Sequence, residues 1–147
     1  MPDFDGMMVN DSVVDRVIVA RYGSGYHRDK LVNDPDSGVR STVAVYGTDT
    51  HRDKLMWDEA ASVRAAVARY GNNVHRNILL SDPDSWVRST VAECGSDSHR
   101  DKLMWDEDAS VRLGVAMHGS VEQLVFLVND EDEQVREEAK YSFNMLN

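Results

Sequence analysis

Residues 34–44 read DPDSGVRSTVA, and residues 82–92 read DPDSWVRSTVA. This stretch decides the fold, because weaker copies of it recur every 24 residues along the chain. The most regular position is an arginine, which occurs at Arg16, Arg40, Arg64, Arg88, Arg112 and Arg136. A fixed period of this length is typical of repeat proteins, in which each unit packs against its neighbours.

The first half of each unit predicts a helix. Asp34 and Asp82 each precede a proline, and Asp followed by Pro is typical of an N-cap and the first helical position. Val39 and Val43 then fall on one helical face. Gly47 and its equivalents are expected to end the helix in a left-handed conformation.

The second half of each unit predicts a shorter helix, because few residues separate Gly47 from Asp58. It is expected to begin after a small polar residue, namely Ser24, Thr48, Asn72, Ser96 or Ser120. Its short length allows an α-helix or a tighter, partly 3₁₀ geometry. Neither helix can bury its apolar face alone, so stacked units must share a core.

The repeated polar residues favour structural roles. Each arginine of the repeat is expected to pair with an Asp or Glu at a neighbouring helix start. The histidines of the second helices are His27, His51, His75 and His99. Stacked helices lie roughly 8–10 Å apart, which is too far for equivalent histidines to share a metal, so they too are expected to be structural.

We expect one solenoid domain over residues 1–147. Residues 1–11 would form an N-terminal cap segment, residues 12–131 five 24-residue repeats, and residues 132–147 a C-terminal capping half-repeat. The ends differ from the middle, as caps must: Asp15 replaces the usual valine, and the last unit is polar.

The D-P-D-S-x-V-R-S-T-V-A stretches, with Leu and Asp closing each period, resemble the leucine-rich repeat variant, a relative of the HEAT-like helical repeats. The resemblance covers residues 12–147. It implies an all-α, right-handed helical-repeat solenoid in which α-helices alternate with 3₁₀ or short α-helices. Some members carry a cysteine-ligated iron–sulfur domain, a function that cannot be transferred because Cys94 is the single cysteine.

Composition limits the partners. Lys plus Arg number 16 and Asp plus Glu number 26, so the formal net charge is −10. This charge opposes direct binding to nucleic acid, which needs clustered positive charge. No apolar run approaches the roughly 20 residues of a membrane span, and residues 1–10 lack a signal-peptide pattern. We therefore expect a cytoplasmic protein without membrane association.

No catalytic motif is present: the chain has no G-x-S-x-G, no phosphate-binding loop and no H-E-x-x-H. Cys94 stands where other units have Tyr22, Tyr46 and Tyr70, and is expected to be a buried, inert thiol. The sequence therefore predicts no enzymatic activity, no cofactor and no metal site.

The candidate binding residues are tryptophans and acids. Trp57 and Trp105 occupy a position held by Asn or Ser in other units, and Trp86 replaces a glycine. Such positions are unlike a deep core, so the rings are expected to be partly exposed interface anchors; packing against an adjacent helix is the alternative. A ridge of acids lies at one edge of the units and includes Asp106, Glu107 and Asp108. This ridge is either a solvated face or a docking strip.

Together these features predict a non-catalytic protein-binding scaffold, whose partner is another protein and for which a basic partner surface would suit the charge. The alternative is an acidic inhibitor that imitates nucleic acid and blocks a nucleic-acid-binding enzyme. A third class, an enzyme like the helical-repeat DNA glycosylases, is opposed by the net charge, since it would need a basic face.

Overall fold

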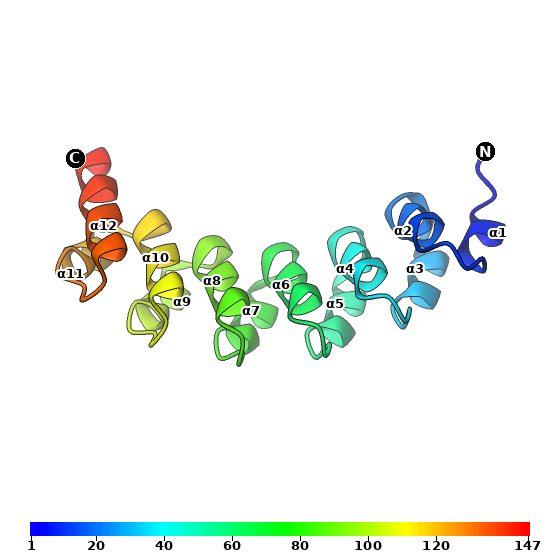
Figure 1. Ribbon diagram of the computed structural model, residues 1–147, viewed down its shortest axis with the longest axis horizontal. Helices are drawn as coiled ribbons and strands as arrows, with labels where there is room; N and C mark the ends of the chain where they lie inside the picture. Colours follow the sequence, from blue (N-terminus) through cyan, green and yellow to red (C-terminus); the bar gives the residue numbers. More distant parts are fainter. The chain divides into compact units, whose positions relative to one another are not determined.

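The computed structural model describes residues 1–147 and contains twelve α-helices and no strand (Figure 1). The chain divides into two compact units, Met1–His75 and Arg76–Asn147, which are described separately. None of the helices is both long enough and apolar enough to cross a membrane.

From α2 to α11 the helices follow the predicted two-helix unit, with ten-residue helices alternating with seven-residue helices, while the end helices α1 and α12 have five and fourteen residues. The first unit holds α1 (Phe4–Met8), α2 (Val13–Tyr22), α3 (Gly25–Leu31), α4 (Ser37–Tyr46), α5 (Asp49–Leu55) and α6 (Ala61–Tyr70), and α7 (Asn73–Leu79) begins in it. The second unit holds α8 (Ser85–Cys94), α9 (Asp97–Leu103), α10 (Ala109–His118), α11 (Val121–Leu127) and α12 (Glu133–Leu146). The all-α repeat fold is thereby confirmed.

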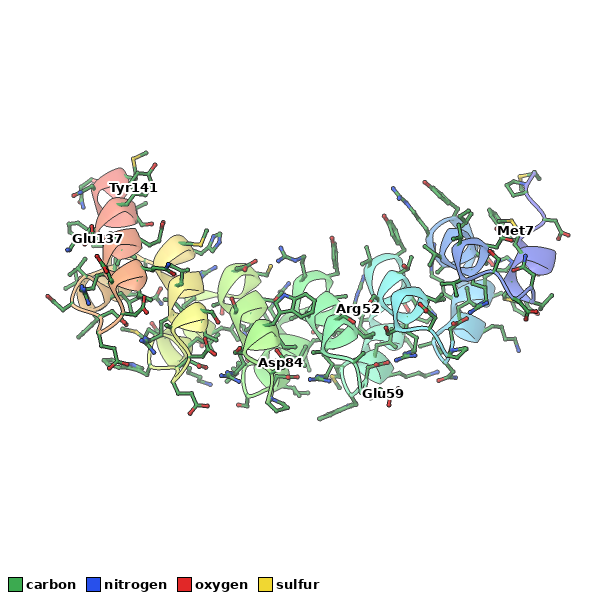
Figure 2. The ribbon with its side chains drawn as sticks, viewed as in Figure 1. Met7, Arg52, Glu59, Asp84, Glu137 and Tyr141 are labelled. Atoms are coloured by element: carbon green, nitrogen blue, oxygen red, sulfur yellow. The ribbon has the colours of Figure 1, made fainter.

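The cap of the first helix lies two residues later than predicted. Asp36, not Asp34, is the N-cap of α4, and its carboxylate accepts the N–H of Gly38 at 2.8 Å. Asp34 cannot cap the helix because its carboxylate binds Arg16 and accepts the N–H of Asp36 at 2.9 Å. In the same way Asp84, in the turn before α8 (Figure 2), is the N-cap that was predicted at Asp82.

The glycine that ends each first helix is not left-handed. Gly47 has φ −81° and ψ −173°, and no residue of the chain has a positive φ. A Cβ at Gly47 would instead lie 2.5 Å from the carbonyl oxygen of Val43 and 2.9 Å from Nδ1 of His51. Close approach of the helix end and the histidine ring therefore explains the glycine, and the predicted conformation was wrong.

A histidine side chain closes the N-terminus of the second helix. Thr48 is the N-cap of α5, and its N–H donates to Nδ1 of His51 at 2.9 Å. Because Nδ1 accepts this bond, the ring proton lies on Nε2, which is 3.0 Å from Oδ1 of Asp29 in the preceding repeat. With both ends satisfied, the segment forms a seven-residue α-helix, one of the two geometries that its length allowed.

The same bond recurs along the chain, which confirms the structural role predicted for the histidines. Its copies join His75 to Asp53 at 2.9 Å and His99 to Asn77 at 3.0 Å. In the last repeat Gln123 replaces the histidine: Oε1 accepts the N–H of Ser120 at 2.9 Å, and Nε2 donates to Asp101 at 2.8 Å. An amide can thus perform both functions of the imidazole.

The core of each unit is a ladder of mostly small apolar side chains, nearly all from helices that pack in succession: α2, α4 and α6 in the first unit, and α8, α10 and α12 in the second. Its residues without exposed surface are Val19, Ala20, Val39, Val43, Ala44, Val63, Val67, Ala68, Val87, Val91, Ala92, Val111, Val115, Ala116, Leu124, Val135 and Ala139. Valine and alanine allow the helices to approach closely, so the repeats stack as predicted.

An arginine–aspartate pair ties each repeat to the next. Arg40 donates from Nε and Nη2 to the two carboxylate oxygens of Asp58, at 2.7 and 2.9 Å. Its Nη1 donates to the carbonyl oxygens of Asp34 and Pro35 at 2.8 and 3.1 Å. The same pairs join Arg16 to Asp34, Arg88 to Asp106 and Arg112 to Asp130. The predicted pairing is confirmed for these four arginines, whereas Arg136 of the last helix donates to the carbonyl oxygens of Asp130 and Glu131.

The arginine sets the ionisation of its partner. Burial, the largest influence, raises the pKa of Asp58, but the hydrogen bonds from Arg40 and from the N–H of Ala60, with the charge of Arg40, outweigh it. The pKa of Asp58 therefore lies below its ordinary value. A carboxylate with this pKa stabilises the folded protein while it is charged.

We predict that Asp58→Asn lowers the free energy of unfolding at pH 7 by about 2 kcal/mol, because it removes the charge that Arg40 binds. Since the folded pKa is lowered, the stabilisation is complete above the unfolded pKa of about 3.9 and is lost as pH falls further. In urea unfolding at a series of pH values, the difference between variant and wild type should shrink below about pH 4.

Glu59→Gln is the matched control, because it changes the neighbouring residue in the same way. The Glu59 side chain is 91% exposed and 3.8 Å from Arg40, so this variant should unfold like the wild type at every pH. A difference between Asp58→Asn and wild type that stays constant from pH 7 to pH 3 would contradict the assigned role.

We also predict that His51→Ala lowers the free energy of unfolding by about 2–3 kcal/mol, because a buried ring and two hydrogen bonds are lost. His51→Gln should cost less than about 1 kcal/mol, because Gln123 shows that an amide makes both bonds. Denaturant unfolding of the two variants at pH 7 measures the difference. Equal losses would show that ring volume matters and the bonds do not.

Candidate functional site

The three tryptophans lie on the surface, as their sequence positions predicted. Trp57 follows α5 and is 68% exposed, and Trp105 follows α9 and is 70% exposed. Trp86 lies in the first turn of α8 and is 56% exposed. Large apolar rings with so much accessible surface contribute little to the core, although Trp105 also contacts Phe126 of the adjacent helix α11.

Trp105 forms one wall of a groove in the second unit. The groove lies between the turn after α9 and the turn after α11 and has a volume of about 430 Å³. Phe126 of α11 also lines it, with the two ring centroids 5.8 Å apart and the ring planes at 60°. Met104 and Leu127, both buried, form its base. The result is an open aromatic groove.

Two of the three acids predicted for the site have structural roles. Asp106 lines the groove, but its carboxylate binds Arg88 at 2.7 and 3.0 Å and accepts the N–H of Asp108 at 2.9 Å. Asp108 is the N-cap of α10 and accepts the hydroxyl and the N–H of Ser110 at 2.6 and 2.8 Å. Both hydrogen bonds lower the pKa of Asp108, and the bond from the Ser110 hydroxyl has the larger effect.

Glu107 differs from these neighbours because its exposed carboxylate forms no hydrogen bond within the protein. On the opposite side of the groove Glu131 is 87% exposed, and only its 3.4 Å contact with Nη2 of Arg112 ties it to the fold. These two glutamates are the acids of the groove that remain available to another molecule.

The acidic ridge expected along one edge is therefore mostly part of the architecture. In most repeats one Asp pairs with the arginine of the preceding repeat, and a second Asp caps the following helix. The pairing residues are Asp34, Asp58, Asp106 and Asp130, and the capping residues are Asp36, Asp84, Asp108 and Asp132. The sequence interpretation explained one acid per repeat, whereas the structure explains two.

The structure does not bring all the predicted site residues together. Neither Trp57 nor Trp86 lines the groove at Trp105. Sequence reasoning also missed Phe126, which stands where three other repeats have Lys30, Lys54 and Lys102 and a fourth has Ile78. An aromatic residue at a position that lysine holds in three other repeats was the signal that could have revealed it.

Two equivalent grooves elsewhere in the chain are polar. The groove beside Asn33 in the first unit has Asn33 and Lys54 where the groove of the second unit has Trp105 and Phe126. The groove beside Ser81 in the second unit likewise has no aromatic lining. The groove shape thus belongs to the repeat, and the aromatic pair belongs to this repeat in particular.

Cys94 is half-buried at the end of α8, so the expectation of a buried thiol was wrong. The equivalent residues Tyr22, Tyr46 and Tyr70 are themselves exposed, because the last turn of each ten-residue helix faces solvent at this position. No group of three His, Cys, Asp or Glu side chains is arranged to hold a metal ion.

No protein-family model matches the chain, and no curated protein matches it in sequence. Among solved structures, a leucine-rich repeat variant with a novel repetitive protein structural motif shares 26% identity with a TM-score of 0.80. The match covers 95% of this chain, which spans 59% of that one. A designed armadillo repeat protein matches at 15% identity and a TM-score of 0.41, over 99% of each chain. The chain therefore has the fold of the leucine-rich repeat variant that its 24-residue unit resembles.

Proposed function

We propose that this protein is a non-catalytic scaffold that binds another protein, with the groove of Trp105 and Phe126 in its contact surface. The observation that carries the proposal is the exposed aromatic pair: Trp105 stands where three other repeats have Asn or Ser, and Phe126 stands where three other repeats have Lys. Since other repeats adopt the same fold with Asn or Ser in place of Trp105 and with Lys or Ile in place of Phe126, stability does not require the rings.

An exposed tryptophan is costly for a protein that has no use for it, because large apolar surfaces favour unspecific association. At interfaces the same side chain is valuable, since it buries a large area with few rotatable bonds and dominates binding energy more than most residue types. Trp57 and Trp86 are as exposed as a contact residue requires, and we include them as further candidate contacts.

The alternative is an acidic inhibitor that occupies the nucleic-acid site of an enzyme. It is supported by the net charge of −10. The hydrogen bonds of the acidic ridge weaken this alternative, because the carboxylates of Asp106 and Asp108 are already bound within the protein. Competition between the bound partner and DNA or RNA would favour this alternative over the scaffold.

Two further expectations stay part of the proposal: the protein acts in the cytoplasm, and it contacts no nucleic acid directly. The second rests on the net negative charge, which opposes binding to phosphate backbones.

We predict that the protein captures a partner from native lysate that survives high salt, because contacts through aromatic rings are not screened. Trp105→Ala should weaken this binding by about 1–4 kcal/mol, the usual range for a hot-spot residue, and Trp57→Ala and Trp86→Ala should do so if their rings are in the interface. Titration of the captured partner, identified by mass spectrometry, measures the loss.

Val14→Ala is the control. Val14 is an apolar residue of the first unit that is 68% exposed and lies outside the candidate site, so the substitution truncates an exposed apolar side chain without touching that site. It should leave the affinity unchanged. If none of the three tryptophan variants moves the affinity, the proposed binding surface is wrong.

A further inference from the structure

We propose that the groove between Trp105 and Phe126 receives an arginine side chain from a basic segment of the protein partner. This inference rests on the proposed scaffold function and specifies the chemistry of the partner. It is argued from the rings, from the charges around them and from the equivalent groove in the first unit.

The rings offer open faces. Trp105 is 70% exposed and Phe126 is 58% exposed, and their tilt of 60° leaves them unstacked. A guanidinium group binds the face of an indole by cation–π attraction and by planar stacking. The protein already uses this contact internally, since the Arg21 guanidinium lies 5.1 and 5.4 Å from the ring centroids of Tyr22 and Tyr46.

The charges around the groove favour a cation. Asp130 is paired with Arg112 and Asp106 with Arg88, so these four charges compensate one another. Glu107 and Glu131 remain, on the two turns that border the groove. An acidic segment would face both carboxylates and be repelled, whereas a basic segment would be attracted.

The shape of the groove suits the rest of an arginine side chain. Its base is formed by Met104 and Leu127, which are buried and apolar. An arginine can lay its methylene stem on such a surface while its planar head lies between an aromatic face and a carboxylate. Guanidinium is also more weakly hydrated than ammonium, so it loses less on leaving water than lysine would.

The groove beside Asn33 in the first unit supplies a negative control within the same chain. Asn33 replaces the indole, and Lys54 places its own positive charge in the groove. Glu59 takes the place of Glu131 and Pro35 that of Glu107, so the two grooves share one rim acid and differ in the aromatic pair and in the second acid. Arginine should therefore bind at Trp105 and not at Asn33.

The test uses the full ¹⁵N-labelled chain and a capped Gly-Arg-Gly peptide, with capped Gly-citrulline-Gly as an uncharged analogue of the same shape. The three tryptophans give three indole N–H signals, which the single Trp→Ala variants assign. We expect the arginine peptide to shift the Trp105 signal saturably and to leave those of Trp57 and Trp86 in place. The citrulline peptide should bind about tenfold more weakly.

Two variants test the acids. The double variant Glu107→Gln, Glu131→Gln should weaken binding of the arginine peptide about tenfold, while Glu59→Gln should have no effect. Equal binding of the arginine and citrulline peptides, or equal shifts of all three indole signals, would overturn the inference. Thermal unfolding of each variant verifies that it is folded.

Failure of this inference is distinguishable from failure of the scaffold proposal. If Trp105→Ala abolishes capture of the protein partner but the groove does not prefer arginine to citrulline, the scaffold stands and the cationic partner is wrong. If the arginine peptide binds at Trp105 but Trp105→Ala leaves partner capture unchanged, the scaffold surface is wrong.

Discussion

The interaction on which the structure depends is the two-point hydrogen bond between an arginine of one repeat and an aspartate of the next. Arg40 lies in a ten-residue helix and reaches Asp58 in the turn that leads into the following helix. The same carboxylate accepts the N–H of Ala60 at 2.9 Å and so shapes its own turn. One side chain thus fixes both the turn and its distance from the preceding helix. This explains why a core of valine and alanine, with little volume to specify a register, is sufficient for stacking.

This use of the aspartates determines what is left for binding. Most carboxylates of the acidic ridge either pair with an arginine or cap a helix. A net charge of −10 therefore does not imply an equally large acidic binding surface. In the groove Trp105, Phe126 and Glu107 perform no such task, and Glu131 has only an exposed 3.4 Å contact with Arg112. Repetition makes this comparison possible, because each repeat shows what the fold itself requires at a position. A residue that departs from the repeat without a structural reason is a candidate for function.

The sequence predicted the repeat, the two helices of each unit and the structural roles of Arg40 and His51, because each of these has a fixed period. It misplaced the N-cap at Asp34. Local preference cannot distinguish Asp34 from Asp36, because Arg16, which binds Asp34, belongs to another repeat. It predicted the exposure of Trp105 but missed Phe126, which lies 21 residues later in the chain. Contacts between repeats require the stacking geometry, which no single unit contains.

A double-mutant cycle on Arg40 and Asp58 tests the dependence of the fold on this bond most directly. Arg40→Ala, Asp58→Ala and the double variant would be unfolded in urea at pH 7, and the coupling energy obtained from the four stabilities. We expect a coupling of about 2 kcal/mol, because the bond is bidentate and shielded from water on both sides. A coupling near zero would contradict the account, because packing of the valine and alanine ladder would then hold the repeats together without the arginine.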